Sequence, residues 1–259
     1  MNYTKVQMSK SRIFMMACSL IAFGVLAGCA KEPEAEGTTP DVIGGNPETS
    51  ATDTTGTPAE ETADPTPAPE APSQAATYQA PEVKTGEEVG VIETAKGQII
   101  VKFFPAVAPK HVAQFKKLAN AKFWDGTRFH RCIPGFMIQG GDPNTKDLSK
   151  AGYWGTGGYE EKGKEVNVPA EFNSTKHVRG VLSAARSQDP DSASSQFFLM
   201  HADSDFLDGQ YSAYGQIVKG IEVVDEIVKT GNPANNGSID DPKDAVLVKT
   251  IRIAKWPVK

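Results

Sequence analysis

Cysteine is scarce in this chain of 259 residues, which has only Cys18, Cys29 and Cys132. Histidine is scarce as well, and its four positions show none of the short spacings that are typical of zinc ligands. We therefore expect neither a disulfide framework nor a metal site. The uncharged run from Ile13 to Ala27 has 15 residues, which is shorter than the ~20 that a membrane-spanning helix requires.

Basic residues are almost absent between residues 31 and 80, where large apolar residues are also rare. This stretch has ten acidic residues, one lysine and three large apolar residues, Val42, Ile43 and Tyr78. It cannot bury a core, and its Pro, Thr, Ala and Glu content predicts a disordered tether with a reach of roughly 40–150 Å. Glycosylation or passage through a cell wall is an alternative use of this composition. The net charge of −5 comes from this tether, and the rest of the chain, being nearly neutral, is not expected to bind nucleic acid.

The first 30 residues predict export. Basic residues precede the uncharged run Ile13–Ala27, as in signal peptides. The run ends in Leu26-Ala27-Gly28-Cys29, which resembles the lipobox of bacterial lipoproteins, where cleavage leaves a lipidated cysteine, here Cys29, at the mature N-terminus. The alternative is an uncleaved signal anchor. The lipoprotein interpretation predicts an extracytoplasmic, membrane-anchored protein, with the cell membrane favoured over an outer membrane.

These observations divide the chain into three expected parts: a signal peptide at residues 1–28, the lipidated cysteine and disordered linker at 29–80, and a folded domain at 81–259. Cys132 lies in an apolar stretch of that domain, so we expect a packed core thiol. No heptad pattern or long apolar stripe indicates an oligomer, and we expect a monomer.

Apolar periodicity predicts a mainly β domain with two amphipathic helices. Residues 88–104 predict a β-hairpin with its turn at Thr94–Gly97, and helices are expected from Pro109 and over Ile221–Lys229. Most other apolar runs are short and bounded by Gly, Pro, Asn or Asp, and they lie at residues 129–133, 136–139, 181–185, 196–201, 212–218 and 245–254. Periodicity alone leaves a barrel and a sandwich open.

Three segments have compositions unlike an ordinary surface or core: Phe129–Asp142, Ser195–Met200 and Phe206–Tyr211. Together they resemble the cyclophilin family of peptidyl-prolyl isomerases, and the resemblance covers Glu88 to Ile253. It implies a closed eight-stranded antiparallel β-barrel with a helix over each end. It also implies an isomerase without a cofactor, whose partners are unfolded or partly folded proteins and peptides that contain Xaa-Pro bonds.

The resemblance also implies roles for individual residues. Arg131 and Gln139 are the catalytic pair, with Gln139 contacting the substrate backbone. The expected substrate-binding residues are Phe136, Met137, Ala185, Arg186, Gln196, Phe198, Phe206, Leu207 and Tyr211. Three of these depart from the eukaryotic pattern: Phe206 replaces a tryptophan, Tyr211 a histidine and Arg186 an asparagine, which bears on cyclosporin binding and substrate preference.

The chemistry can be argued without the family. Resonance gives the peptide bond a rotation barrier of ~18–20 kcal/mol. As the bond twists, the proline nitrogen gains a lone pair, so a fixed donor aimed at that nitrogen stabilises the twisted state more than either planar isomer. An arginine suits this role because it stays charged and projects rigid N–H groups.

Two other functions remain open. A noncatalytic chaperone could use the same apolar residues to hold proline-containing segments, and the substitutions at Arg186 and Tyr211 are compatible with it. A lipoprotein that captures a small molecule is a weaker alternative, because the sequence shows no charged ligand clamp.

Overall fold

The structure, a computed structural model, describes residues 78–258. The expected signal peptide, Cys29 and most of the expected linker lie outside the described residues.

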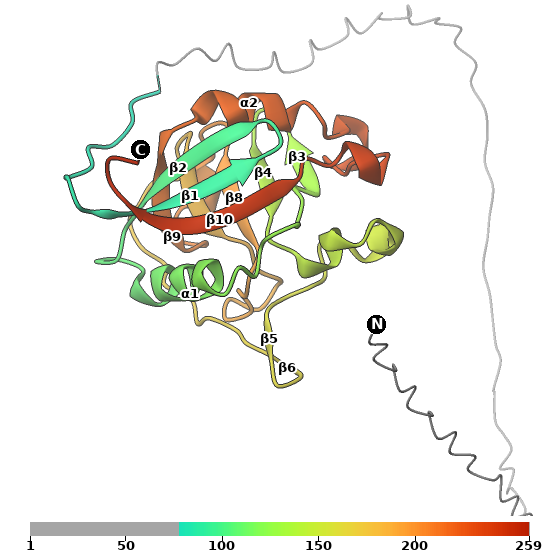
Figure 1. The fold of residues 1–259 in the computed structure, drawn as a ribbon, viewed down its shortest axis with the longest axis horizontal. Coiled ribbons are helices and arrows are strands. Elements are labelled where there is room, and N and C mark those ends of the chain that lie inside the picture. The colour runs from blue at the N-terminus through green and yellow to red at the C-terminus, as the bar shows by residue number, and fades with distance from the viewer. Residues whose placement is uncertain (1–77, 259) are drawn as a thin grey trace, which may run out of the picture. The chain divides into compact units, whose positions relative to one another are not determined.

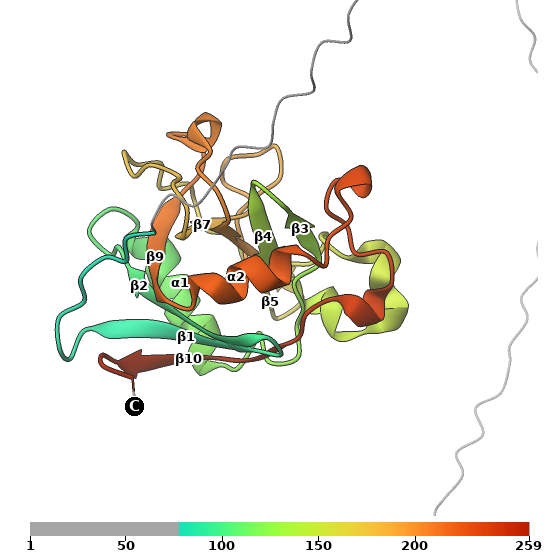
Figure 2. The ribbon, with the colours of Figure 1, turned by 90° about the horizontal axis from the view of Figure 1, so that it is seen from above.

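One antiparallel sheet dominates the fold (Figures 1 and 2). Its strands are β1 (Glu88–Thr94), β2 (Gly97–Phe103), β3 (Arg131–Ile133), β4 (Met137–Gly140), β7 (Val181–Ala184), β8 (Phe197–Met200), β9 (Ala213–Lys219) and β10 (Val248–Lys255). The remaining elements are the helices α1 (Pro109–Asn120) and α2 (Ile221–Val228), the small hairpin of β5 (Glu160–Glu161) and β6 (Lys164–Glu165), and five short 3₁₀ helices.

The expected hairpin and both expected helices are confirmed. Strands β1 and β2 pair from Val89–Lys102 to Thr94–Gly97, so the turn falls where it was predicted. Helix α1 begins at Pro109 without a side-chain cap. The Glu171 carboxylate instead accepts hydrogen bonds from the backbone N–H groups of Lys110 and His111, both at 2.9 Å. A negative charge at this end also interacts favourably with the helix dipole.

The eight strands form a curled sheet, so the expected closed barrel is wrong. The strand order is β10-β1-β2-β9-β7-β8-β4-β3, and among the described residues β3 does not pair with β10. The outer edge of β3 is occupied by a loop instead, because Cys132 N–H donates to Gly237 O at 2.7 Å. Just before β3, Arg128 forms an isolated antiparallel bridge with Leu247, which precedes β10, and Val248 N–H donates to Thr127 O at 2.8 Å.

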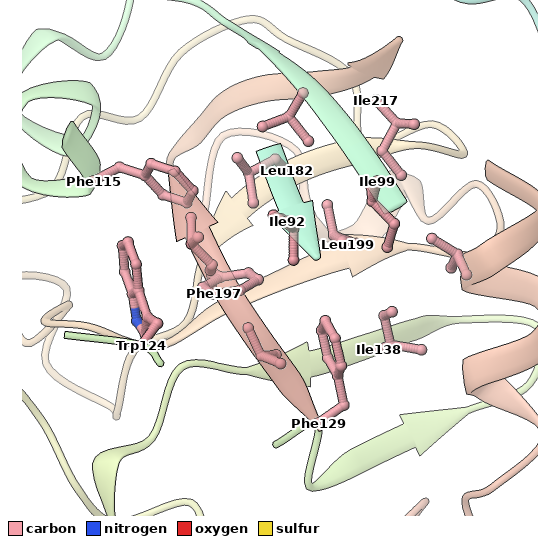
Figure 3. Packing of buried hydrophobic residues seen from close by; sticks show 14 of the residues in the cluster. Ile92, Ile99, Phe115, Trp124, Phe129, Ile138, Leu182, Phe197, Leu199 and Ile217 are labelled. Atoms are coloured by element: carbon pink, nitrogen blue, oxygen red, sulfur yellow. The ribbon is translucent and has the colours of Figure 1, made fainter. Parts of the chain in front are cut away.

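The main core fills the inside of the curled sheet. Figures 1 and 2 show α1 and α2 on opposite sides of the sheet, and each contributes one apolar face to this core, Val112, Phe115 and Leu118 from α1 and Val224, Ile227 and Val228 from α2. Figure 3 shows aromatic and aliphatic side chains from both halves of the chain interleaved there. This burial of apolar area is the main stabilising contribution to the fold.

Tyr78, which we expected within the linker, packs against the main core. Its hydroxyl donates a hydrogen bond to Ile217 O on β9. Its ring lies over Gly180, where a Cβ atom would come within 2.5 Å of Tyr78 Cε2, and Gly180 has a φ of +87°. Burial raises the pKa of Tyr78 to about 12. The chain is therefore attached to β7 and β9 three residues before the expected start of the domain.

No helix within residues 78–258 is long and apolar enough to cross a membrane.

Candidate active site

The hairpin of β3 and β4 sorts its side chains into two faces. Arg131 pairs with Gln139, Cys132 with Ile138 and Ile133 with Met137. Because side chains alternate along a strand, Cys132 and Ile138 point into the main core while Arg131, Gln139 and Met137 share the opposite face. This alternation explains why an arginine and a glutamine interrupt an apolar stretch of sequence.

An asparagine from a distant loop holds the guanidinium of Arg131. Arg131 Nη2 donates to Asn236 Oδ1 at 2.8 Å, and Nε donates to Asn236 O at 3.1 Å. Nη1 has no hydrogen-bond partner among residues 78–258. Partial burial lowers the pKa of Arg131, but an arginine remains charged in proteins at neutral pH.

Beside Arg131 lies a pocket of about 100 Å³ with an apolar floor. Met137, Phe198 and Leu207 form its buried floor, with exposures of 2–5%. The pocket is lined by Arg131, Phe136, Met137, Gln139, Ala185, Arg186, Phe198, Leu207 and Tyr211. The structure thus brings together nine of the eleven site residues predicted from the sequence, and none of the nine is acidic.

Gln139 is fixed by a chain of hydrogen bonds. Its Nε2 donates to Gln196 Oε1 at 2.9 Å, and Gln196 Nε2 donates to the carbonyls of Gly155 and Gly157 at 2.9 and 2.8 Å. Gln196 does not line this pocket. It lies beside the pocket, in a neighbouring polar cavity of about 290 Å³ that shares Gln139, Ala185 and Arg186 with it.

The geometry is therefore a small pocket with an apolar floor, lined also by the guanidinium-bearing residues Arg131 and Arg186. The profile of the family described as "Cyclophilin type peptidyl-prolyl cis-trans isomerase/CLD" matches residues 89–258. The chain belongs to the cyclophilin-type peptidyl-prolyl cis-trans isomerase family.

Individual relatives agree with this membership. The chain is 42% identical over 168 residues to the "Probable peptidyl-prolyl cis-trans isomerase" of Brucella abortus, covering 64% of this chain and 83% of that protein. It is 33% identical over 172 residues to "Peptidyl-prolyl cis-trans isomerase B" of Escherichia coli, covering 62% and 97%. A Cryptosporidium parvum cyclophilin-type isomerase, crystallised in the presence of the dipeptide Ala-Pro, matches with 28% identity and a TM-score of 0.54, covering 64% of this chain and 99% of that one.

Two of the three departures within this cyclophilin domain have visible structural consequences. The guanidinium of Arg186 donates to the carbonyls of Ser187, Gln188 and Gln210, and it lies 4.6 Å from the centre of the Tyr211 ring. Arg186 is thus held by its own chain and forms part of the wall between the two cavities. The cation–π contact with Arg186 also orients Tyr211.

Phe206 is a predicted site residue that lies outside the pocket. Its side chain is 66% exposed, and it does not line the pocket. Its ring centre is 5.5 Å from that of Phe136, so the two rings extend the apolar surface outside the mouth.

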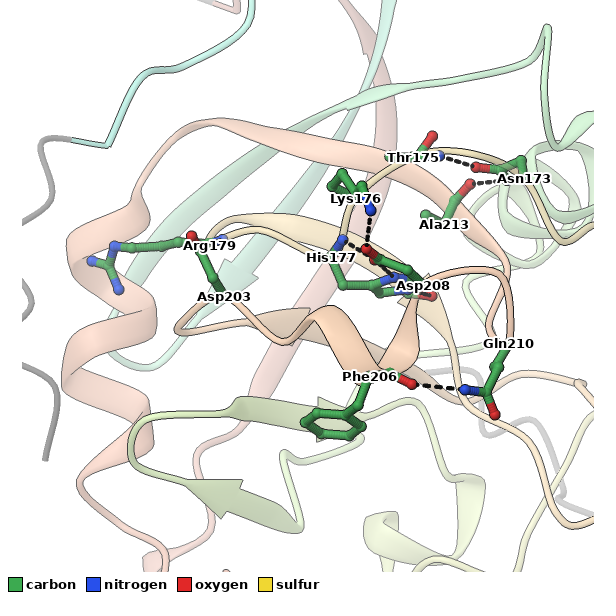
Figure 4. A network of polar contacts seen from close by, with 11 residues as sticks. Asn173, Thr175, Lys176, His177, Arg179, Asp203, Phe206, Asp208, Gln210 and Ala213 are labelled. Atoms are coloured by element: carbon green, nitrogen blue, oxygen red, sulfur yellow. Dashed lines mark hydrogen bonds and ion pairs between the residues drawn. The ribbon is translucent and has the colours of Figure 1, made fainter. Parts of the chain in front are cut away.

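A polar group around the buried His177 supports the pocket floor of the cyclophilin domain and was not predicted from the sequence. Lys176 and His177 converge on Asp208 (Figure 4). His177 Nδ1 lies 3.1 Å from Asp208 Oδ1, and Nε2 lies 3.0 Å from Ser183 Oγ. The Lys176 ammonium lowers the pKa of Asp208 to about 2. Burial lowers the pKa of His177, so we assign a neutral imidazole that donates from Nδ1 and accepts at Nε2.

This group acts on the pocket through aromatic contacts. The imidazole of His177 is stacked with the ring of Phe198, with centres 6.2 Å apart, and meets the Tyr211 ring edge-on at 6.5 Å. Lys176, His177 and Asp208 are polar residues in loops, and no spacing in the sequence marks them as a group.

His201 similarly supports the turn that carries Phe136. Its Nδ1 accepts a hydrogen bond from Gly135 N–H at 3.0 Å, and its backbone N–H donates to Phe136 O at 2.8 Å. Nε2 lies 3.4 Å from Asp225 Oδ1 on α2. The position of Phe136 at the pocket mouth is therefore linked to helix α2.

Other candidate chemistry finds no support in this part of the chain. Residues 78–258 contain no group of three or more His, Cys, Asp or Glu side chains that could hold a metal ion. Cys132 is fully buried, and burial raises the pKa of its thiol to about 12. The expectation of a packed core thiol is confirmed.

Proposed function

We propose that this cyclophilin domain accelerates rotation about Xaa-Pro bonds, with Arg131 as its catalytic residue. The observation that carries the proposal is the position of the Arg131 guanidinium, held by Asn236 beside a pocket with an apolar floor, with Nη1 unpaired among residues 78–258. A substrate proline ring would rest on Met137, Phe198 and Leu207, in a pocket whose volume of about 100 Å³ suits one such ring.

The proposed mechanism needs no change in covalent bonds. With the proline ring held in the pocket, the acyl part of the bond turns, and the proline nitrogen becomes pyramidal and gains a lone pair. Arg131 Nη1–H donates to that lone pair, and Gln139, oriented by Gln196, binds the backbone of the substrate. Both planar isomers lack the lone pair, so the interaction with Arg131 lowers the barrier instead of only tightening binding.

The expected size of the effect is moderate. A hydrogen bond from a charged donor contributes ~1.5–3 kcal/mol, which corresponds to roughly 10- to 150-fold in rate. The low dielectric of the pocket strengthens the interaction further.

The proposed setting is the outer side of a membrane. The lipobox at Leu26–Cys29 and the acidic, proline-rich stretch that follows it support a lipid-anchored protein whose domain extends from the surface on a tether. Its clients would then be exported proteins that fold near the membrane, which contain Xaa-Pro bonds in either isomer when unfolded.

A second candidate role, holding unfolded chains without catalysis, is favoured by the exposed ring of Phe206 next to Phe136. One pair of assays separates the two roles. We expect wild-type protein to accelerate cis–trans exchange of an Ala-Pro peptide and the refolding of a protein limited by proline isomerisation. Arg131→Ala should lose both accelerations and still suppress aggregation of an unfolded client. A folded wild-type protein that does not accelerate exchange would contradict the isomerase proposal and leave the holding role.

A further inference from the structure

The contacts of Tyr78 with the domain, which we call the Tyr78 anchor, fix where the preceding chain leaves the domain. Tyr78 lies over Gly180 and is hydrogen-bonded to Ile217 O. A second contact follows along the chain, where Lys102 Nζ donates to Glu82 O at 2.6 Å. The chain before Tyr78 therefore starts from a defined place at the beginning of β7.

Strand β7 leads directly from this anchor to the pocket. It occupies Val181–Ala184, and the next two residues, Ala185 and Arg186, line the pocket. From Gly180 to Ala185 the strand rises ~3.4 Å per residue, so the anchor and this wall of the pocket are about 17 Å apart.

The sequence just before the anchor is rich in potential substrate bonds. It contains Asp64-Pro65, Thr66-Pro67, Ala68-Pro69 and Ala71-Pro72. Pro69 lies nine residues before Tyr78, a length that spans up to ~30 Å at 3.3–3.6 Å per residue. Pro72 lies six residues before Tyr78, a length that spans at most ~20 Å and barely covers the distance between Tyr78 and this wall of the pocket. Ala68-Pro69 is thus the first Ala-Pro bond upstream of the anchor that can reach the pocket with slack.

Charge also favours contact between this proline-rich segment and the pocket. Asp64 precedes Pro65 and Glu70 follows Pro69, whereas the pocket is lined by Arg131 and Arg186 and by no acidic side chain. Opposite charges within about a Debye length, ~8–10 Å at physiological ionic strength, attract each other.

We propose that the cyclophilin pocket binds and isomerises the Ala68-Pro69 bond of its own chain. This inference rests on the proposed isomerase function and names an intramolecular substrate for it. A short tether gives the segment an effective concentration on the order of millimolar, so it competes with external clients in the same molecule. Prolines 20 or more residues upstream of Tyr78 have a roughly three- to tenfold lower effective concentration, because this quantity falls as about the −3/2 power of tether length.

The test compares two matched sets of linker substitutions in the chain from Ala30 to Lys259. The near variant is Pro65→Ala, Pro67→Ala, Pro69→Ala and Pro72→Ala, and the distal control is Pro33→Ala, Pro40→Ala, Pro47→Ala and Pro58→Ala. We expect the near variant to lower the KM for an external Ala-Pro peptide about twofold or more with unchanged kcat, and the distal variant to match wild type. Exchange at Ala68-Pro69, followed by NMR, should be at least tenfold faster in wild type than in Arg131→Ala.

The outcomes distinguish the two proposals. This inference would be overturned if KM were equal for wild type, the near variant and the distal variant, and if exchange at Ala68-Pro69 were uncatalysed while the external peptide exchanged fast. The isomerase proposal would then stand. An equal fall in KM for the near and distal variants would also overturn it. No acceleration of the external peptide by wild type would show that the isomerase proposal itself has failed.

Discussion

At the scale of single residues, the site depends on groups that hold Arg131 and the pocket floor in place. Arg131 alone is an unremarkable surface cation, and its role follows from Asn236, which accepts two of its hydrogen bonds. Asn236 has a φ of +51°, a left-handed conformation that asparagine tolerates better than most residues. The next residue, Gly237, also has positive φ, and a Cβ there would collide with Ile133 and Cys132 O. The loop thus depends on an Asn-Gly pair to approach β3.

Asn236 is expected to act as a positioning residue. Asn236→Gly keeps the backbone carbonyl and the left-handed conformation but removes the side-chain acceptor, so we expect kcat to fall about tenfold, the equivalent of ~1.4 kcal/mol, with little change in peptide Kd. Asn236→Asp, which keeps an acceptor, should retain most activity, and Asn235→Ala, at an exposed neighbour, should match wild type. A fall in thermal stability that accounts for the lost activity of Asn236→Gly would contradict a positioning role.

His130 is expected to make the stability of the domain depend on pH. Its side chain is buried, Nδ1 has no hydrogen-bond partner within residues 78–258, and burial lowers its pKa from 6.5 to about 4. The folded state therefore binds fewer protons than the unfolded state between these values, and stability is lost as pH falls through this window. At ~1.4 kcal/mol per pKa unit, the loss is about 3 kcal/mol between pH 6.5 and 4.

Urea unfolding at pH 7 and pH 5 measures this effect. We expect wild type to lose about 2 kcal/mol more stability than His130→Gln over this interval, since the other three histidines are common to both proteins. The same loss in both proteins would assign the pH dependence to other groups.

At the scale of elements, local sequence signals and long-range contacts contributed differently to what could be predicted. The β1–β2 hairpin and both helices follow from apolar periodicity and from Pro109, which are local signals. The pocket residues followed from the family resemblance. The partner of Arg131 could not be predicted, because Asn236 lies 105 positions away and loop geometry brings them together. The open sheet was missed for a similar reason, since the edge of β3 is taken by the loop at Gly237 and not by β10.

The packing of Tyr78 against the domain can be tested by mutation. Tyr78→Ala removes an aromatic ring from the surface of the main core and leaves a gap over Gly180, so we expect the free energy of unfolding to fall by about 2 kcal/mol. Tyr153→Ala, at a residue that is 68% exposed, should change it by less than ~0.5 kcal/mol.

Truncation should have the same effect as Tyr78→Ala. We expect a domain that begins at Pro81 to have a free energy of unfolding about 2 kcal/mol lower than a domain that begins at Tyr78. Chemical denaturation of these four proteins checks both expectations. Equal stability of the two truncated domains would contradict a structural role for Tyr78.

At the scale of the whole molecule, the sequence predicts that a lipid on Cys29 holds the domain at a membrane. Cys29→Ser should remove palmitate labelling and shift the protein from the detergent phase to the aqueous phase. Cys18→Ser is a matched control within the expected signal peptide and should behave like wild type. Equal partitioning of both variants and wild type would contradict a lipid on Cys29.

The central claim is that Arg131 stabilises the twisted peptide bond and not simply the bound peptide. The most direct test measures the catalysed exchange rate and the Kd of one Ala-Pro peptide by NMR, for the domain from Tyr78 to Lys259 and for its Arg131→Ala variant. The domain suits this test because a solved cyclophilin matches it over 99% of its own length. We predict that kcat falls about 100-fold, within the range expected for one charged hydrogen bond, while Kd changes by less than about fivefold. A Kd that weakens as much as the rate falls would show that Arg131 contributes only to binding and would contradict the account.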